Sequence, residues 1–101
     1  MSKNLTILLA FLMTFGSQVN AFDPADLRKL KDTGDCSKCD LSNADLEGSF
    51  LLSADLWEAN LEGANLKGAI LIGAKIGYAN LKGAKLSGAD MRDASMQNVN
   101  L

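Results

Sequence analysis

The chain has 101 residues, of which 48% are hydrophobic and 22% charged, with ten basic against twelve acidic residues. This length accommodates one small domain. The sequence has no histidine and two cysteines, so it lacks a Ser-His-Asp triad, a Cys-His pair and the ligands of a tetrahedral zinc site. A net charge of −2 also lacks the basic surplus of a nucleic-acid-binding protein. We therefore expect no catalytic residues, no cofactor, no metal and no nucleic-acid partner.

The first 21 residues have the pattern of a secretory signal peptide. Lys3 supplies a positive charge, an apolar run extends from Leu5 to Phe15, and small residues precede a cleavage point after Ala21. The apolar run is shorter than the about 20 residues that a membrane span needs. The sequence therefore predicts that residues 1–21 are removed on export and that the mature chain has no membrane attachment.

Residues 22–38 are predicted to form a short capping helix and a linker. Asp23 is suited to the N-cap, and Pro24 to the first helical position, where no backbone N–H is needed. Leu27 and Leu30 then provide one apolar stripe. Gly34 predicts the end of the helix.

From residue 39 to residue 101 a large apolar side chain recurs every five residues. The thirteen centres are Leu41, Leu46, Leu51, Leu56, Leu61, Leu66, Leu71, Ile76, Leu81, Leu86, Met91, Met96 and Leu101. The residue two places before each centre is small, most often Ala. On an α-helix these centres would spiral around the cylinder, and in a flat strand they would alternate between faces. All of them can point inward only if the chain turns a corner once per repeat, so the sequence predicts a coil around an apolar core.

The charges indicate how many repeats make one coil, because residues one coil apart stack about 4.8 Å from each other. Three repeats per coil would stack like charges, such as Glu47 on Glu62. Four repeats per coil stack opposite charges instead: Glu47 with Lys67, Glu62 with Lys82, and Asp55 with Lys75. The same register forms one polar ladder from Asp40, Asn60, Asn80 and Asn100. We therefore predict a four-sided coil of 20 residues, and about three coils in all.

The repeat resembles the A(D/N)LxG motif of the pentapeptide repeat proteins. The motif is complete at residues 44–48, 64–68 and 79–83, and the resemblance covers residues 39–101. It implies an all-β fold, the right-handed quadrilateral β-helix, in agreement with the four-sided register. On function it implies little: some cytoplasmic members mimic DNA and bind type II topoisomerases, whereas other members lie in the periplasm or the thylakoid lumen.

Cys36 and Cys39 form a CxxC segment that continues into Asp40 and Leu41. This CxxCDL sequence resembles the opening of exported members of the family. In an oxidising compartment we expect a structural disulfide between Cys36 and Cys39 that fastens the capping helix to the first coil. Cys39 occupies the inner position that Ala fills elsewhere, so it is expected to be buried. A redox-active dithiol, a reduced pair and a metal contact shared with another chain are the alternatives.

Outward positions hold a group of apolar residues that we call the apolar patch. Its members are Phe50, Leu52, Trp57, Ile70, Ile72 and Tyr78. In the four-sided register Phe50 stacks on Ile70, and Leu52 on Ile72. The charged residues around the patch are Asp55, Lys75, Asp90 and Arg92. Apolar residues aligned on a surface are typical of a protein contact, so the patch is the candidate partner surface; the alternatives are burial within the monomer and a functionless cluster of β-forming residues.

The last coil is expected to leave an open β edge over Met91, Met96 and Leu101. Unpaired N–H and C=O groups on such an edge invite pairing with another chain. The sequence therefore predicts a homodimer through the C-terminal coil; the alternative is a monomer with a frayed last coil.

Together these features predict an exported, non-enzymatic interaction or scaffold protein of the periplasm or the thylakoid lumen, with an unidentified protein as its partner. The alternative is a DNA mimic that binds a type II topoisomerase, which only the family resemblance suggests. Four lysines interrupt any acidic track that such a mimic would need: Lys67, Lys75, Lys82 and Lys85. A thiol-disulfide enzyme built on the CxxC segment is the third possibility.

Overall fold

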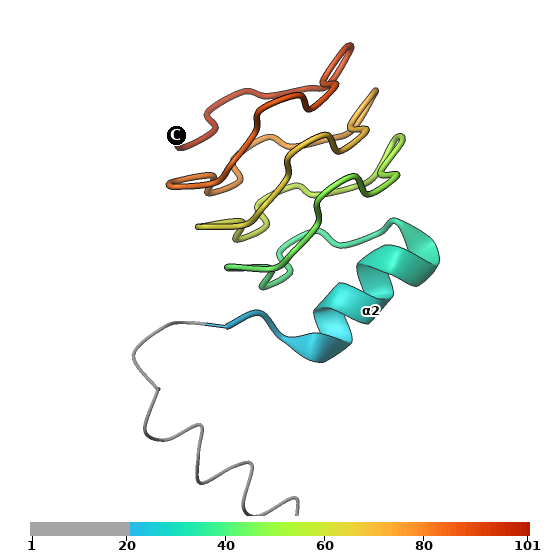
Figure 1. The fold of residues 1–101 in the computed structure, drawn as a ribbon, viewed down its shortest axis with the longest axis vertical. Coiled ribbons are helices and arrows are strands. Elements are labelled where there is room, and N and C mark those ends of the chain that lie inside the picture. Colours follow the sequence, from blue (N-terminus) through green and yellow to red (C-terminus); the bar gives the residue numbers. More distant parts are fainter. Residues whose placement is uncertain (1–20) are drawn as a thin grey trace, which may run out of the picture.

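The computed structural model describes residues 21–101. Except for Ala21, the predicted signal peptide of residues 1–21 lies outside these described residues. Within them, one α-helix, α2 (Pro24–Thr33), precedes a stack of coils (Figure 1). This part of the chain contains no helix with the length and apolarity that crossing a membrane requires.

Helix α2 begins and ends where its sequence signals predict. The Asp23 carboxylate accepts a hydrogen bond from the backbone N–H of Ala25 at 2.9 Å, which is an N-cap contact. At the other end Gly34 has φ 73° and donates its N–H to the carbonyl oxygen of Leu30 at 2.8 Å. Glycine adopts this left-handed conformation without the steric cost of a Cβ atom.

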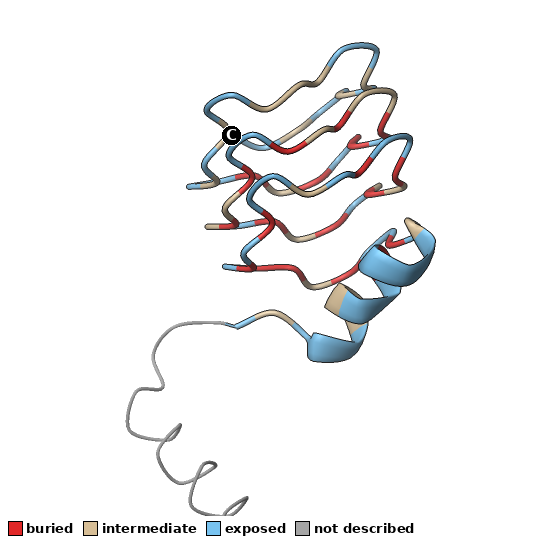
Figure 2. Ribbon diagram, turned by 45° about the vertical axis from the view of Figure 1, so that its right-hand side comes forward, coloured by how far each residue is buried: buried red, intermediate tan, exposed pale blue. Residues whose placement is uncertain are grey.

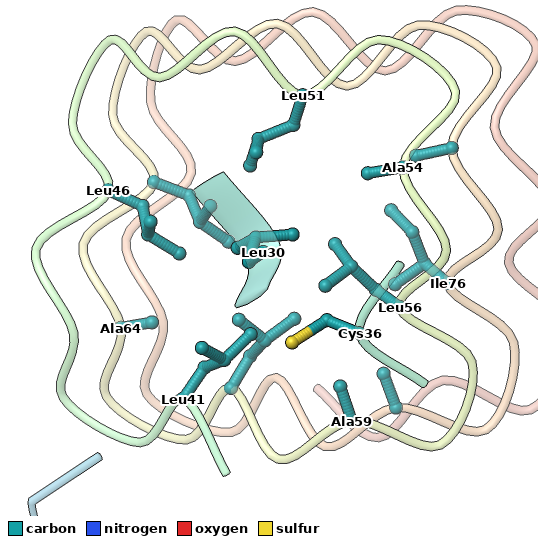
Figure 3. Packing of buried hydrophobic residues seen from close by; sticks show 14 of the residues in the cluster. Leu30, Cys36, Leu41, Leu46, Leu51, Ala54, Leu56, Ala59, Ala64 and Ile76 are labelled. Atoms are coloured by element: carbon teal, nitrogen blue, oxygen red, sulfur yellow. The ribbon is translucent and has the colours of Figure 1, made fainter. Parts of the chain in front are cut away.

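Helix α2 covers the N-terminal end of the coil stack. Leu30 is 1% exposed and points into the core of the first coil (Figure 3). The backbone N–H of Asp23 donates to the carbonyl oxygen of Asp40 at 3.0 Å, and the Asp26 carboxylate accepts the N–H of Asp40 at 2.8 Å. The helix thus seals the apolar interior and also occupies backbone groups of the first coil.

The coils stack in parallel with a register of 20 residues. Ten β-bridges join residues 20 positions apart, from Asp35 with Asp55 to Asn80 with Asn100. Between the bridges, hydrogen bonds such as that from Leu41 N–H to the Asn60 carbonyl oxygen, 2.8 Å, hold each coil on the next. One coil therefore takes four five-residue repeats, as the charge pattern predicts.

The chain turns each corner through the same backbone conformation. In Ala44, for example, the N–H donates to the carbonyl oxygen of Leu41 at 3.1 Å. The residue two places after each centre has φ between 55° and 73°, as in the third position of a type II turn. Glycine fills this position in six repeats, but Tyr78 occupies it with φ 60°.

Asp and Asn side chains stabilise these turns. The residue before a centre accepts, through its side-chain oxygen, the N–H two positions later, as Asn80 accepts the N–H of Lys82 at 3.0 Å. Asp45 and Asn60 make the equivalent bonds at 3.2 and 3.1 Å. These local bonds are Asx turns, and they explain why the repeat favours Asp or Asn at this position.

The centres and the small residues fill the interior of the coils (Figure 3). Cys36, 0% exposed, takes the central position of one repeat more than the sequence predicts, and Asp35 already pairs with Asp55. The coil thus begins at residue 35 rather than 39. A search for Leu-like centres misses this repeat, because a disulfide-bonded cysteine is a small apolar side chain that fills the same space.

The predicted charge stacking gives the correct register but not ion pairs. Within residues 21–101 the ion pairs are Lys38 with Glu58 at 3.9 Å and Asp90 with Arg92 at 2.7 Å. Glu47 does not pair with Lys67; it accepts a hydrogen bond from the Asn65 side chain at 3.1 Å. An ion pair between exposed side chains contributes little stability in water. The shorter amide side chain of Asn65 can therefore replace Lys67 as the partner of Glu47.

Candidate functional site

The apolar patch lies on the outside of the coils, as the register predicts. Phe50 is 74% exposed, Tyr78 51% and Leu52 49%. Trp57, Ile70 and Ile72 are half-buried. The described chain therefore leaves three members of the patch largely exposed and covers the other three only in part.

Two columns of the patch share one face, which we call the Phe50 face. The first column consists of Phe50, Ile70 and Asp90, joined in that order by parallel β-bridges. The N–H of Leu51 donates to the Ile70 carbonyl oxygen at 2.8 Å, and the N–H of Leu71 donates to the Asp90 carbonyl oxygen at 2.7 Å. This column has two apolar rows and then an acidic one.

The second column of the Phe50 face consists of Leu52, Ile72 and Arg92. Its rows are held by hydrogen bonds from Ser53 N–H to the Ile72 carbonyl oxygen, 2.8 Å, and from Gly73 N–H to the Arg92 carbonyl oxygen, 2.9 Å. It repeats the pattern of the first column but ends on a basic residue. The face therefore carries two apolar rows and a third row with one charge of each sign.

Asp90 and Arg92 bind each other within that third row. Nε and Nη2 of Arg92 donate to the two carboxylate oxygens of Asp90 at 2.9 and 2.7 Å. The hydrogen bonds from Arg92 hold the pKa of Asp90 below its ordinary value, and the same bonds raise the pKa of Arg92. Both groups are therefore charged at neutral pH, and the polar end of the face is an ionic one.

Trp57 and Tyr78 form an aromatic pair on the next face. Their ring centroids are 5.2 Å apart with 60° between the ring planes, an edge-to-face contact. The Trp57 ring lies over Gly77 in the next coil, where a Cβ atom would collide with it. The backbone of Tyr78 adopts the left-handed conformation, with φ 60°. This conformation costs free energy for a bulky residue.

Cys36 and Cys39 form a disulfide, and Cys39 is 4% exposed. Both cysteines belong to the first coil and lie three residues apart, so the bond does not fasten α2 to the coil, contrary to the expectation from sequence. Asp26 fastens the helix instead, through its bond to the N–H of Asp40. The Cys36 sulfur lies 3.2 Å from the carbonyl oxygen of Asp26, but a disulfide sulfur has no proton to donate, so this is a packing contact.

A shallow hollow on the opposite face contains no converging reactive groups. Its lining combines the two corner glycines Gly63 and Gly83 with Glu62 and Lys82. The nearby Ser42 hydroxyl already donates to the Asp40 carboxylate at 2.8 Å. Within residues 21–101 no three Asp, Glu or Cys side chains gather as metal ligands would.

The last coil is less buried than the coils before it (Figure 2). Leu86, Met91 and Met96 are half-buried, and Leu101 is 73% exposed. In contrast, Leu81 and the centres before it are at most 5% exposed. The terminal coil therefore presents apolar side chains as well as an open backbone edge.

The five-residue repeats of this chain match the model of a known protein family. The model of "Pentapeptide repeats (8 copies)" matches residues 35–71 and 77–101. The chain belongs to the pentapeptide repeat family. This confirms the resemblance seen in the A(D/N)LxG motif, and the match also begins at residue 35, where the coil begins.

Solved structures of other pentapeptide repeat proteins resemble this one, and the one with a TM-score above 0.5, together with the family match, implies a right-handed β-helix. Rfr23 from the cyanobacterium Cyanothece 51142 is 35% identical with a TM-score of 0.54, and the match covers 65% of this chain and 52% of that one. HetL from Nostoc sp. strain PCC 7120, a protein involved in heterocyst differentiation regulation, is 36% identical over 60% of this chain and 31% of its own, with a TM-score of 0.42. A third, alr5209 from Nostoc PCC 7120, is 31% identical over 81% of this chain and 78% of its own, with a TM-score of 0.29. No curated protein matches the chain.

Sequence reasoning located the apolar patch of this pentapeptide repeat protein but missed the role of Gly77. The other corner glycines lie two places after a centre, whereas Gly77 directly follows the centre Ile76. Its position one coil after Trp57 is the signal that could have revealed the contact.

Replacing Gly77 by Ala should displace the Trp57 ring, because the new Cβ atom collides with it. Trp57 is the only tryptophan, so its fluorescence emission is expected to shift to the red as the ring enters water. The matched control is Gly48→Ala, where φ is 67° and nothing lies within 4 Å of the new Cβ atom. The control should lose about 1 kcal/mol of stability through backbone strain with unchanged emission. Unchanged emission in Gly77→Ala would contradict the stacking of Trp57 on Gly77.

Proposed function

We propose that this protein is an exported, non-enzymatic interaction or scaffold module, and that the apolar patch is the surface that binds its partner protein. In this proposal a quadrilateral coil of about three turns is the rigid support that holds the patch flat. The observation that carries the proposal is the exposure of Phe50, 74%, in a position that most other repeats fill with Asp or Asn.

The position of Phe50 and Ile70 gives this observation its weight. Both residues precede a centre, where Asp or Asn would bond to the following turn, as Asn80 does to the N–H of Lys82. Phe50 forgoes that bond and remains 74% exposed, and Ile70 forgoes it for partial burial only. A contact with another protein would supply the missing burial, and aromatic residues such as Trp57 and Tyr78 are typical of the residues that dominate binding energy.

The disulfide supports a structural rather than an enzymatic role for the cysteines. Thiol-disulfide exchange needs an accessible sulfur atom and a thiol of low pKa. Cys36 is 0% exposed and Cys39 4% exposed. These values favour a structural disulfide over a catalytic dithiol.

The alternative function, a DNA mimic that binds a type II topoisomerase, requires a continuous acidic surface. Lysines interrupt the columns of this chain instead: Lys75 forms a β-bridge with Asp55, and Lys85 forms one with Asn65. Lysines inside these columns weaken the resemblance to a phosphate track, so we favour the interaction module.

Export to the periplasm or the thylakoid lumen rests on the predicted signal peptide and agrees with the disulfide. The mature protein purified from its host should have an intact mass that lacks residues 1–21 and two hydrogen atoms. A full-length chain with two free thiols would contradict export and would favour the DNA mimic.

The partner-binding role is tested by changing three residues of the patch together: Phe50→Asn, Ile70→Asn and Ile72→Thr. Because these side chains point outward, the circular dichroism spectrum should stay unchanged, and the two Asn residues can form the turn-stabilising bonds of the other repeats. Affinity capture from the envelope fraction should then lose the partner that the wild-type chain retains.

The matched control for this variant changes two outward residues of the opposite face, Glu62→Thr and Lys82→Thr, and should capture the partner as the wild type does. Unfolding of the triple variant would show that its residues belong to a core. Equal capture by all three proteins would refute the patch as the binding surface.

We also propose a homodimer through the C-terminal coil, supported by the exposure of Leu101 and the half-burial of Met91 and Met96. A second copy would pair the open backbone edge and bury these side chains. At micromolar protein concentration, Met96→Lys should therefore convert this end-to-end dimer to a monomer in sedimentation velocity, because two lysines would meet in the interface. A wild-type chain that is already monomeric would contradict this proposal.

A further inference from the structure

We propose that the Phe50 face binds the same face of a second copy, with the two coil stacks side by side and parallel. This inference rests on the proposed function, since it names the partner of four residues of the apolar patch. It differs from the end-to-end dimer, because it uses the side of the coil and not its open edge.

The Phe50 face consists of three rows of two side chains each, and the order of these rows supports the side-by-side dimer. The rows are Phe50 with Leu52, then Ile70 with Ile72, then Asp90 with Arg92. Within each row one residue precedes the centre and the other follows it, so the two columns stand on either side of a central line. The acid is in one column and the base is in the other.

A two-fold axis between two copies pairs these rows with chemically matching rows. An axis that runs parallel to the coil stack keeps each row level with itself but exchanges the two columns. Phe50 then faces Leu52 of the second copy, and Ile70 faces Ile72. Asp90 faces Arg92 of the second copy. Because the axis is two-fold, each of these contacts occurs twice in the dimer. Apolar rows meet apolar rows, and each charge meets its opposite.

Antiparallel pairing of the same faces is disfavoured by the same rows. It reverses their order, so that the Asp90 and Arg92 row lies against Phe50 and Leu52. Burying charged groups against apolar side chains costs free energy. The charge row therefore selects the parallel arrangement.

Arg92 has the hydrogen-bonding capacity for this contact. Its bonds to Asp90 in the same chain use Nε and Nη2. An arginine has five N–H donors, so Nη1 is available to a carboxylate of the second copy. Two such pairs across the axis would form a cluster of four charges with no net charge.

The small area of the Phe50 face predicts a weak association between the two copies. Three rows at about 4.8 Å spacing, two side chains wide, bury far less than the about 800 Å² per partner of a standard interface. The association should therefore be weak, and it should be measured up to protein concentrations of about 1 mM, where weak complexes are populated.

The test uses two charge-reversal variants, Asp90→Arg and Arg92→Asp. Each variant alone places like charges opposite each other in the parallel dimer, and its self-association should fall about tenfold or more. An equimolar mixture restores opposite charges in both contacts, because the two arginines of one chain face the two aspartates of the other. Sedimentation equilibrium of the mature protein, with one variant labelled, should therefore show heterodimers with wild-type affinity.

The control is Met96→Lys, which lies outside the Phe50 face and should leave this association unchanged. If Met96→Lys abolishes self-association and the charge variants do not, the side-by-side dimer is refuted. The inference is also overturned if the wild type stays monomeric at about 1 mM or if the mixture associates no better than either variant alone. In those cases the proposed function survives when the wild type captures a different protein that the triple variant loses, and fails when it captures none.

Discussion

The stacking of backbone hydrogen bonds at a 20-residue register is the constraint on which the rest of this structure depends. Once Leu41 N–H bonds to the Asn60 carbonyl oxygen, every side chain lies directly beside the residue 20 positions away. Residues in equivalent positions therefore share one environment: the centres share the core, and the outward positions form columns. A substitution at an outward position therefore changes contacts with the neighbouring coils more than contacts with residues adjacent in sequence.

This constraint explains both the turns and the unusual surface. Asp or Asn before a centre bonds to the next turn locally, so a repeat that follows the motif stabilises itself without help from a partner. Phe50 and Ile70 break the motif in the same column, where the register brings them together on one exposed face. On this face the protein thus has an apolar surface in place of local turn stabilisation, with Asp90 and Arg92 at its end.

The two ends of the coil stack are treated differently. At the first coil, Leu30 of α2 fills the core, and Asp26 accepts a backbone N–H that would otherwise lack a partner in the coil. The disulfide between Cys36 and Cys39 acts within this coil and stiffens its opening turn. At the last coil the centres are half-buried, and its outer backbone edge faces solvent in the described chain. Interaction surfaces are thus expected on the side and at the C-terminal end, not beneath the helix.

The sequence by itself determined the repeat length, the inward centres from Leu41 to Leu81 and the 20-residue register, because each follows from a local pattern that recurs many times. It also determined the ends of α2, because the capping residues act locally. It located the columns of the apolar patch for the same reason. Only the tertiary structure decided that the coil starts at Asp35, that Glu47 bonds to Asn65 rather than Lys67, and that Trp57 rests on Gly77. These contacts depend on side-chain orientation and on the space that a neighbouring coil leaves, which no periodic pattern of residue types specifies.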